Sequence, residues 1–236
     1  MSRQSDSMAS PINAPVIVAL DVESIGAARN LVARLGDSAS FYKVGLELYT
    51  ASGMELVDEL KLAGKRVFLD LKLYDIGETV KRAVAQVAKR GADFLSVHGS
   101  LAVMQSAVAG KGDAPLKLLA ITVLTSFDET DLRQLGYPCD VKTLVELRVR
   151  NAMTSGIDGV VCSPLEVAGV RAITGPQAVL VTPGVRSTGA GLGDQKRVAT
   201  PAEAIASGAS YLVIGRQITR AADPRAEMQR VRAELS

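Results

Sequence analysis

The chain has 236 residues, and its 27 Lys and Arg against 25 Asp and Glu give a formal net charge of +2. The sequence has neither the block of basic residues nor the interleaved aromatic residues that are typical of nucleic-acid binders. No apolar run approaches the ~18 residues that span a bilayer, so we expect neither a membrane segment nor a nucleic-acid partner. Two cysteines are too few for a disulfide framework, which predicts a reducing, cytoplasmic location.

The first 13 residues lack the apolar core of a signal peptide, and we expect them to form a flexible tail before one domain at 14–236. Within that domain, short apolar runs rich in β-branched residues predict strands. The predicted strands are Val16–Leu20, Ser40–Gly45, Arg66–Lys72, Ala92–His98, Leu116–Leu124, Ile157–Ser163, Ala178–Gly184 and Ser210–Arg216. Because these runs are apolar on both faces, we expect both faces of the sheet to be covered.

Segments between the strands carry helical periodicity. The clearest are Glu23–Leu35, Gly53–Ala63, Thr79–Arg90, Leu144–Thr154 and Arg225–Leu235. Many helices should end in a left-handed glycine that turns the chain back, at Gly36, Gly64, Gly91, Gly156 and Gly208. Eight alternating units favour an α/β fold, a (β/α)8 TIM barrel in a single domain, although periodicity alone leaves an open, doubly wound sheet as the alternative.

Charged residues fall at the carboxyl ends of the first three strands, where barrel enzymes carry their chemistry. These are Asp21, Lys43, Asp70, Lys72 and Asp75. A regular pleat would place Asp70 and Lys72 on one face about 6.8 Å apart, with Lys43 about 5 Å to the side. Opposite charges would then alternate and keep one another ionised, which suits a proton donor beside a fixed negative charge. The alternative is a structural ion-pair network that closes the barrel.

The last two strands end in residues suited to phosphate binding. Pro183 and Arg186 follow the seventh strand, and Gly215 with Arg216 follows the eighth. Arginine suits bidentate phosphate binding, and this end of a barrel is the usual phosphate site. The glycine-rich connection 184–200, which includes Gln195, predicts a mobile lid, with an irregular surface loop as the alternative.

These segments together resemble the orotidine 5′-phosphate decarboxylase family. The resemblance spans nearly the whole chain through VALD, YKVG, FLDLKLYDI, VHGS, TVLTS, VTPGVR, GDQKR and VIGR, in that order. It implies decarboxylation of orotidine 5′-phosphate to uridine monophosphate (UMP) in pyrimidine biosynthesis, without a cofactor or a metal. It also implies that Lys72 donates the proton, within an alternating array of Lys43, Asp70, Lys72 and Asp75.

The resemblance further implies a homodimer, in which Asp75 and Thr79 enter the partner's site, and a set of ligand contacts. Asp21 and Lys43 correspond to ribose contacts, and Thr125 to a group near the pyrimidine. The implied substrate-binding set is Asp21, Lys43, Ile76, Thr79, Thr125, Pro183, Arg186, Gln195, Gly215 and Arg216. One departure is that Gly77 and Glu78 stand where the family commonly has Pro-Asn, which puts the local loop shape in question.

Three further residues at strand ends are not predicted to take part in catalysis. His98, the only histidine, is predicted to be structural or to lie at an interface. Cys162 and Ser163 have no apparent base partner, which argues against nucleophilic catalysis.

Two other functions stay open at this point. One is a magnesium-dependent sugar-phosphate decarboxylase or aldolase of the same superfamily, which also carries an Asp-x-Lys-x-x-Asp segment. The other is a catalytically silent barrel that binds a phosphorylated ligand.

Overall fold

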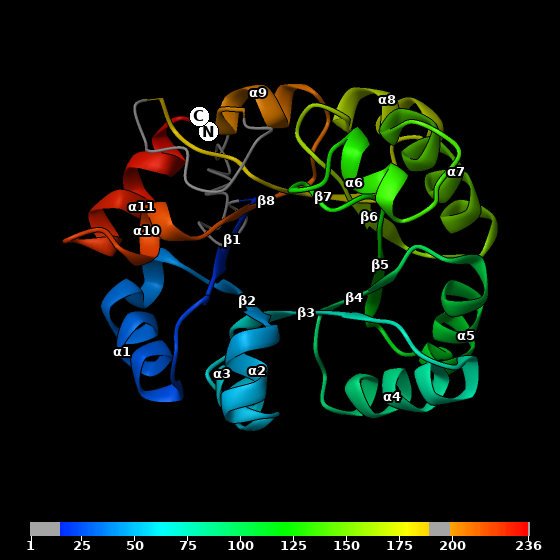
Figure 1. Cartoon of the computed structure of the whole chain (residues 1–236). Coiled ribbons are helices and arrows are strands. Elements are labelled where there is room, and N and C mark those ends of the chain that lie inside the picture. Colours follow the sequence, from blue (N-terminus) through cyan, green and yellow to red (C-terminus); the bar gives the residue numbers. More distant parts are fainter. Residues whose placement is uncertain (1–14, 189–198, 236) are drawn as a thin grey trace, which may run out of the picture.

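A computed structural model describes residues 15–188 and 199–235, and its strands close into a barrel (Figure 1). The strands are β1 Val16–Ala19, β2 Phe41–Gly45, β3 Arg66–Leu73, β4 Phe94–His98, β5 Lys117–Ile121, β6 Gly159–Val161, β7 Val179–Pro183 and β8 Tyr211–Ile214. They pair in chain order, all in parallel, and β8 closes the ring on β1. The predicted (β/α)8 barrel and its strands are confirmed. Several predicted ranges were too long because apolar residues continue into the loops, as after β5.

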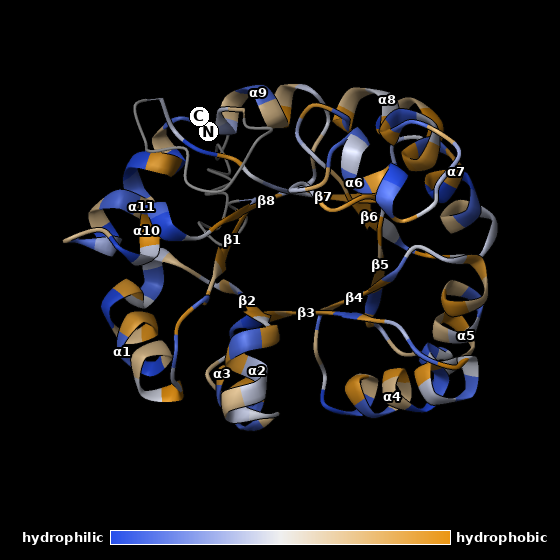
Figure 2. Cartoon of the chain, viewed as in Figure 1, coloured by the Kyte–Doolittle hydropathy of each residue, from blue (hydrophilic) through white to orange (hydrophobic). Residues whose placement is uncertain are grey.

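Helices surround the strand ring, with apolar sides toward the barrel and polar sides outward (Figures 1 and 2). They are α1 Ile25–Leu35, α2 Leu46–Ser52, α3 Glu55–Leu62, α4 Gly77–Lys89, α5 Leu101–Lys111, α6 Glu129–Gln134, α7 Val141–Thr154, α8 Val167–Thr174, α9 Pro201–Ala206, α10 Arg216–Thr219 and α11 Pro224–Ala233, with a 3-10 turn η1 at Gly36–Ser38. The glycines predicted to turn the chain back all have positive φ. No helix in the described ranges combines the length and apolar character that a bilayer crossing requires.

The core has two regions, one between the barrel and its helices and one inside the barrel. The inner region includes Ile17, Phe41 and Phe68, which project inward from the first three strands. Two residues further along β2 and β3, the next inward positions carry the charged side chains of Lys43 and Asp70, whereas on β1 Ala19 stands between Ile17 and Asp21. The barrel interior is therefore apolar toward the amino ends of the strands and polar at their carboxyl ends.

At the opposite end of the barrel, side chains just before alternate strands tie neighbouring elements together. Asp158, which precedes β6, accepts hydrogen bonds from the Leu118 N–H of β5 at 2.8 Å and from Lys111 Nζ of α5 at 2.8 Å. Asp93 makes the same pair of contacts before β4, with β3 and α3. Ser210 takes this place before β8 and contacts β7 and α8. Each of these three side chains, Asp93, Asp158 and Ser210, acts as a clamp that joins the start of its strand to the preceding strand and helix.

Replacing Asp158 with alanine should lower the free energy of unfolding by about 2 to 3 kcal/mol, because it leaves a buried N–H and a lysine without their acceptor. Urea denaturation measures the change. Asp113→Ala is the matched control, since Asp113 is exposed and lies two residues after the end of the same helix α5. Equal stability of the two variants would contradict the role of this clamp.

Candidate active site

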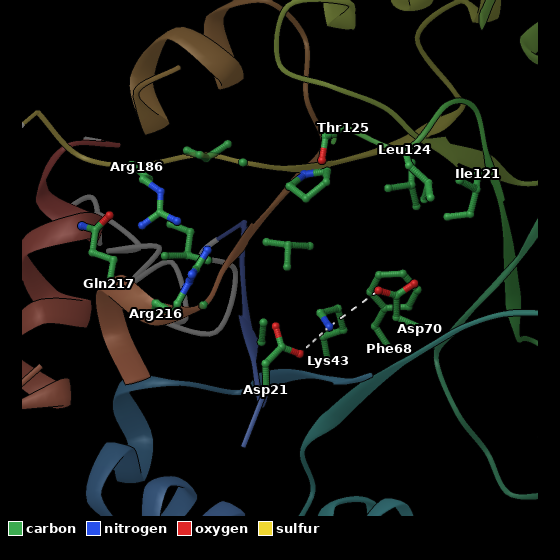
Figure 3. Close-up of a pocket in the computed structure, with 18 of the residues that line it drawn as sticks. Asp21, Lys43, Phe68, Asp70, Ile121, Leu124, Thr125, Arg186, Arg216 and Gln217 are labelled. Carbon is green, nitrogen blue, oxygen red and sulfur yellow. Dashed lines mark hydrogen bonds and ion pairs between the residues drawn. The ribbon is translucent and has the colours of Figure 1, made fainter. Parts of the chain in front are cut away.

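The carboxyl ends of the strands surround a cavity of about 560 Å³ (Figure 3). Its lining includes most of the site residues predicted from the sequence. These are Asp21, Lys43, Asp70, Lys72, Thr125, Pro183, Arg186, Gly215 and Arg216. They come from six different strand ends and the segments that follow them, so closure of the barrel brings together residues far apart in the sequence.

Four charged side chains alternate in sign along one wall of the cavity. Lys43 Nζ lies 2.8 Å from Asp21 Oδ1 and 3.6 Å from Asp70 Oδ2 (Figure 3). Lys72 Nζ lies 2.9 Å from Asp70 Oδ1. The order is therefore Asp21, Lys43, Asp70, Lys72, which places each lysine beside a carboxylate.

Burial opposes ionisation of the central pair, but their neighbours outweigh it. Burial lowers the pKa of Lys43, yet Asp70 and Asp21 raise it above its ordinary value overall. Burial raises the pKa of Asp70, yet Lys43 and Lys72 bring it below its ordinary value. Asp70 therefore contributes stability above the ordinary carboxyl pKa, and this is lost as the pH falls through its lowered pKa. The contribution of Lys43 is present below the ordinary lysine pKa and is lost as the pH rises through its raised pKa.

The backbone at Lys72 departs from the regular pleat that the sequence predicted. Lys72 has φ of +50°, and the register between β3 and β4 shifts between Leu69 and Leu73. Such an irregularity re-aims a side chain, which a period-two pattern cannot anticipate. The predicted regular pleat through Asp70 and Lys72 is wrong, although their side chains still meet.

Gly45 allows Lys43 and Asp21 to approach each other. It is the next inward position after Lys43 on β2, and a Cβ atom there would lie 2.9 Å from Lys43 Nζ and 3.1 Å from Asp21 Oδ1. Gly45 belongs to the YKVG segment, but no role was predicted for it. The sequence feature that could have indicated this role is a glycine two residues after an inward lysine, because a larger side chain at that position would enter the site.

The opposite end of the cavity is rich in arginine. Arg186 follows β7, and Arg216 begins α10 directly after Gly215. Figure 3 shows Arg186 and Arg216 on the same side of the cavity, away from Asp70. This end has the donor groups that a phosphate dianion requires. Gln195, predicted to join them, lies outside the described residues.

Gln217 lines this end of the cavity and was not predicted. Its amide nitrogen donates to Ser187 Oγ at 2.7 Å and to Glu227 Oε1 at 2.8 Å, and its oxygen accepts the Ser187 N–H at 3.0 Å. Gln217 thereby fixes the segment after β7 against α10 and α11. Only the fold reveals this role, because its partners are far apart in the sequence.

Three predicted residues do not line this cavity. Asp75, Ile76 and Thr79 lie after β3 on the exposed surface, and 77% of Ile76 is exposed. The Asp75 carboxylate accepts the N–H of Ile76 at 2.6 Å. Within one described chain, the array therefore contains Lys43, Asp70 and Lys72 but not Asp75.

A second cavity of about 430 Å³ adjoins the first and shares Lys72 with it. Its walls are largely apolar and aromatic, and include Tyr74 and Leu135, which are both exposed. His98 also lines this second cavity and stacks on Tyr74, with ring centroids 4.3 Å apart. Burial and the nearby Arg148 lower the pKa of His98, which favours the neutral ring.

The local packing explains why glycine stands at position 77, where the family commonly has proline. Gly77 is the first residue of α4, and a Cβ atom there would lie 2.5 Å from Ser106 Oγ of α5. Glycine therefore suits the close contact between these two helices.

The end of β6 offers no reactive nucleophile. Burial raises the pKa of the Cys162 thiol to about 12, which keeps it protonated. Ser163 is fully buried and does not line the first cavity. Within residues 15–188 and 199–235, no group of three or more His, Cys, Asp or Glu side chains is placed to hold a metal ion.

Comparisons with known proteins give one consistent result. The profile of the orotidine 5′-phosphate decarboxylase / HUMPS family matches residues 14–231. An orotidine 5′-phosphate decarboxylase of Rhodopseudomonas palustris strain BisB5 is 53% identical over 221 residues, which cover 94% of each chain. That of strain BisA53 is 52% identical over 230 residues, covering 97% of this chain and 98% of the other. A crystal structure of orotidine 5′-phosphate decarboxylase from Lactobacillus acidophilus superposes with a TM-score of 0.83 at 36% identity, covering 94% of this chain and 99% of that one.

Proposed function

The chain belongs to the orotidine 5′-phosphate decarboxylase / HUMPS family and converts orotidine 5′-phosphate to UMP in pyrimidine biosynthesis, and from this premise we propose that Lys72 protonates C6 of the pyrimidine. The observation that carries the proposal is the alternating array in the cavity, in which the Lys72 ammonium lies 2.9 Å from the Asp70 carboxylate. A cation held there can stabilise negative charge that develops beside it.

The chemistry requires such a cation. When the bond between C6 and the carboxylate breaks, carbon dioxide leaves and the electron pair stays on C6 in an in-plane orbital that the ring cannot delocalise. The Lys72 ammonium stabilises this pair and then transfers one N–H proton to C6, which gives UMP and a neutral amine that regains its proton from water. Asp70, held ionised by two lysines, crowds the substrate carboxylate in the ground state and favours its departure.

The remaining predicted contacts position the substrate. Arg186, Gly215 and Arg216 bind the phosphate, together with Gln195 outside the described residues. Asp21 and Lys43 bind the ribose hydroxyls, while Thr125 and Pro183 lie beside the pyrimidine. Binding energy from the remote phosphate thus contributes to the barrier reduction at C6.

We further propose that the active form is a homodimer, in which Asp75, Ile76 and Thr79 enter the partner's site. Two observations support this. Two large apolar side chains that follow β3 are exposed, Tyr74, which lines the second cavity, and Ile76. The apolar second cavity adjoins Lys72, where an entering partner segment would complete the charge array.

Mixing two inactive variants tests the shared site. Lys72→Ala and Asp75→Ala proteins, unfolded and refolded together at equal concentration, should regain about one quarter of the wild-type activity, because half of the dimers are hybrids with one intact site. The control is each variant refolded alone. An inactive mixture that still forms dimers would contradict the contribution of Asp75 across the interface.

Gly45→Ala should reduce kcat/KM about 10-fold or more, because the added methyl group displaces the Lys43 ammonium from Asp21. The thermal midpoint should change little, since the clash is with the flexible end of a side chain and φ of −89° suits alanine. Gly169→Ala is the control, as nothing lies within 4 Å of its added Cβ. A variant with unchanged kcat/KM would contradict the need for glycine at position 45.

Turnover in excess chelator tests whether this chain needs a metal. The absorbance of orotidine 5′-phosphate should change steadily to that of UMP with purified protein and chelator. Activity lost in chelator and restored by magnesium would instead support metal-dependent chemistry. UMP binding without turnover would support a silent binding barrel.

A further inference from the structure

Ser96 connects β4 to both catalytic groups of β3. Its hydroxyl accepts a hydrogen bond from the Lys72 backbone N–H at 2.9 Å and donates one to Asp70 Oδ1 at 2.8 Å. Ser96 is fully buried and is the inward position that follows Phe94 on its strand. A hydroxyl group there, among apolar neighbours, therefore has both of its contacts on the charge array.

The backbone at Lys72 needs support. Among the residues that the structure describes, Lys72 is the only one other than glycine with positive φ. A left-handed conformation costs a non-glycine residue of order 1–2 kcal/mol, and it persists only where the surroundings hold it. The register shift between β3 and β4 also takes the Lys72 N–H out of the regular strand ladder, and Ser96 Oγ supplies the acceptor in its place.

The contacts form a closed ring. The Lys72 N–H donates to Ser96, the Ser96 hydroxyl donates to Asp70 Oδ1, and the same oxygen accepts from Lys72 Nζ at 2.9 Å. Both ends of the Lys72 residue, its backbone and its ammonium, are thus fixed relative to one carboxylate oxygen. Since misplacement of a reacting group by about 1 Å can cost 10²-fold in rate, this ring bears directly on proton delivery.

We propose that Ser96 is a positioning residue, which holds Lys72 in its left-handed conformation and Asp70 in its fixed orientation so that the ammonium is aimed at the reacting carbon. The inference rests on the proposed role of Lys72 as proton donor. It adds a residue that lines neither cavity and that acts only through the two groups it bonds.

Ser96→Ala tests this role. We expect kcat to fall about 10- to 100-fold, as expected for loss of hydrogen bonds to a charged group and to a strained backbone. KM and the affinity for UMP should stay within about threefold, because the phosphate and ribose contacts remain. Ser163→Ala is the matched control, since Ser163 is equally buried at the end of another strand and lies outside the cavity. Ser96→Thr or Ser96→Asn, which keep a polar group at this position, should recover much of kcat.

The pH profile of kcat gives a second measurement that a purely structural role would not change. The groups facing Asp70 are Lys43 from β2, Lys72 from β3 and Ser96 from β4. The Ser96 hydroxyl bonds to the ionised form of Asp70, so its removal raises the pKa of Asp70 and moves the acid limb of the profile to higher pH.

The outcomes separate this inference from the proposed function. A wild-type kcat in Ser96→Ala would overturn the role of Ser96 and leave that of Lys72 intact. Loss of UMP affinity in parallel with kcat, with an unmoved acid limb and no recovery in either polar variant, would show that Ser96 is merely structural. Turnover retained in Lys72→Ala would instead refute the proton donor.

Discussion

Replacing Lys72 with alanine should reduce kcat by about 10⁴-fold or more, because in its proposed role Lys72 is both the general acid and the charge that stabilises the carbanion. Binding of UMP should persist, since the proposed ribose and phosphate contacts come from other strands. The measurement is the absorbance change of orotidine 5′-phosphate with enzyme in excess, alongside a titration with UMP.

Lys72→Arg separates charge from proton transfer. Arginine keeps a cation in the site but does not give up its proton at neutral pH, so this variant should also fail to turn over. Lys142→Ala is the control, as Lys142 is an exposed lysine on α7. Retained decarboxylation in Lys72→Ala would refute the donor role.

Arg216→Ala should lose about 2 to 4 kcal/mol of transition-state stabilisation, measured from kcat/KM for orotidine 5′-phosphate. The reason is that, in the proposed arrangement, the guanidinium contacts a phosphate dianion whose binding energy contributes to the reaction at the distant carbon. With orotidine, which lacks the phosphate, the same substitution should change kcat/KM little, because the contact is already absent.

Arg225→Ala provides the comparison for this second prediction, since Arg225 is an exposed arginine in the first turn of the neighbouring helix α11. An unchanged kcat/KM in Arg216→Ala would contradict the assignment to phosphate. An equal loss with both substrates would place Arg216 elsewhere in the site.

The fold was predictable because the barrel repeats one pattern. Apolar runs such as Val16–Leu20 alternate with amphipathic segments, and glycines such as Gly64 mark the returns, so each unit could be identified on its own. The number of units favoured closure, and the structure decides for the closed barrel over the open, doubly wound sheet. The strand ends were harder to place, because β5 stops at Ile121 while its apolar run continues.

The charged residues of the site were predictable from their places at strand ends, whereas their support was not. Lys43, Asp70 and Lys72 stand out in an apolar strand sequence. Ser96, Gly45 and Gln217 do not, because their roles depend on register and on contacts between distant segments. The bulge at Lys72 was missed for the same reason, since a left-handed lysine leaves no mark in the sequence.

Asp75 is the one residue of the predicted charge array that the fold of a single chain leaves apart from the others. Its motif predicted a charged group in the site, yet it lies outside the cavity of its own chain. In the proposed homodimer its contribution comes from a second copy, and neither strand periodicity nor the geometry of one chain positions that copy.

A crystal structure of this protein with bound UMP would test the central claim most directly. We predict that Lys72 Nζ lies about 3 to 3.5 Å from C6, the contact distance of a reacting pair, with Asp70 beside it and the phosphate at Arg216. A UMP molecule with C6 turned away from Lys72, or with its phosphate beside Asp70, would contradict the account.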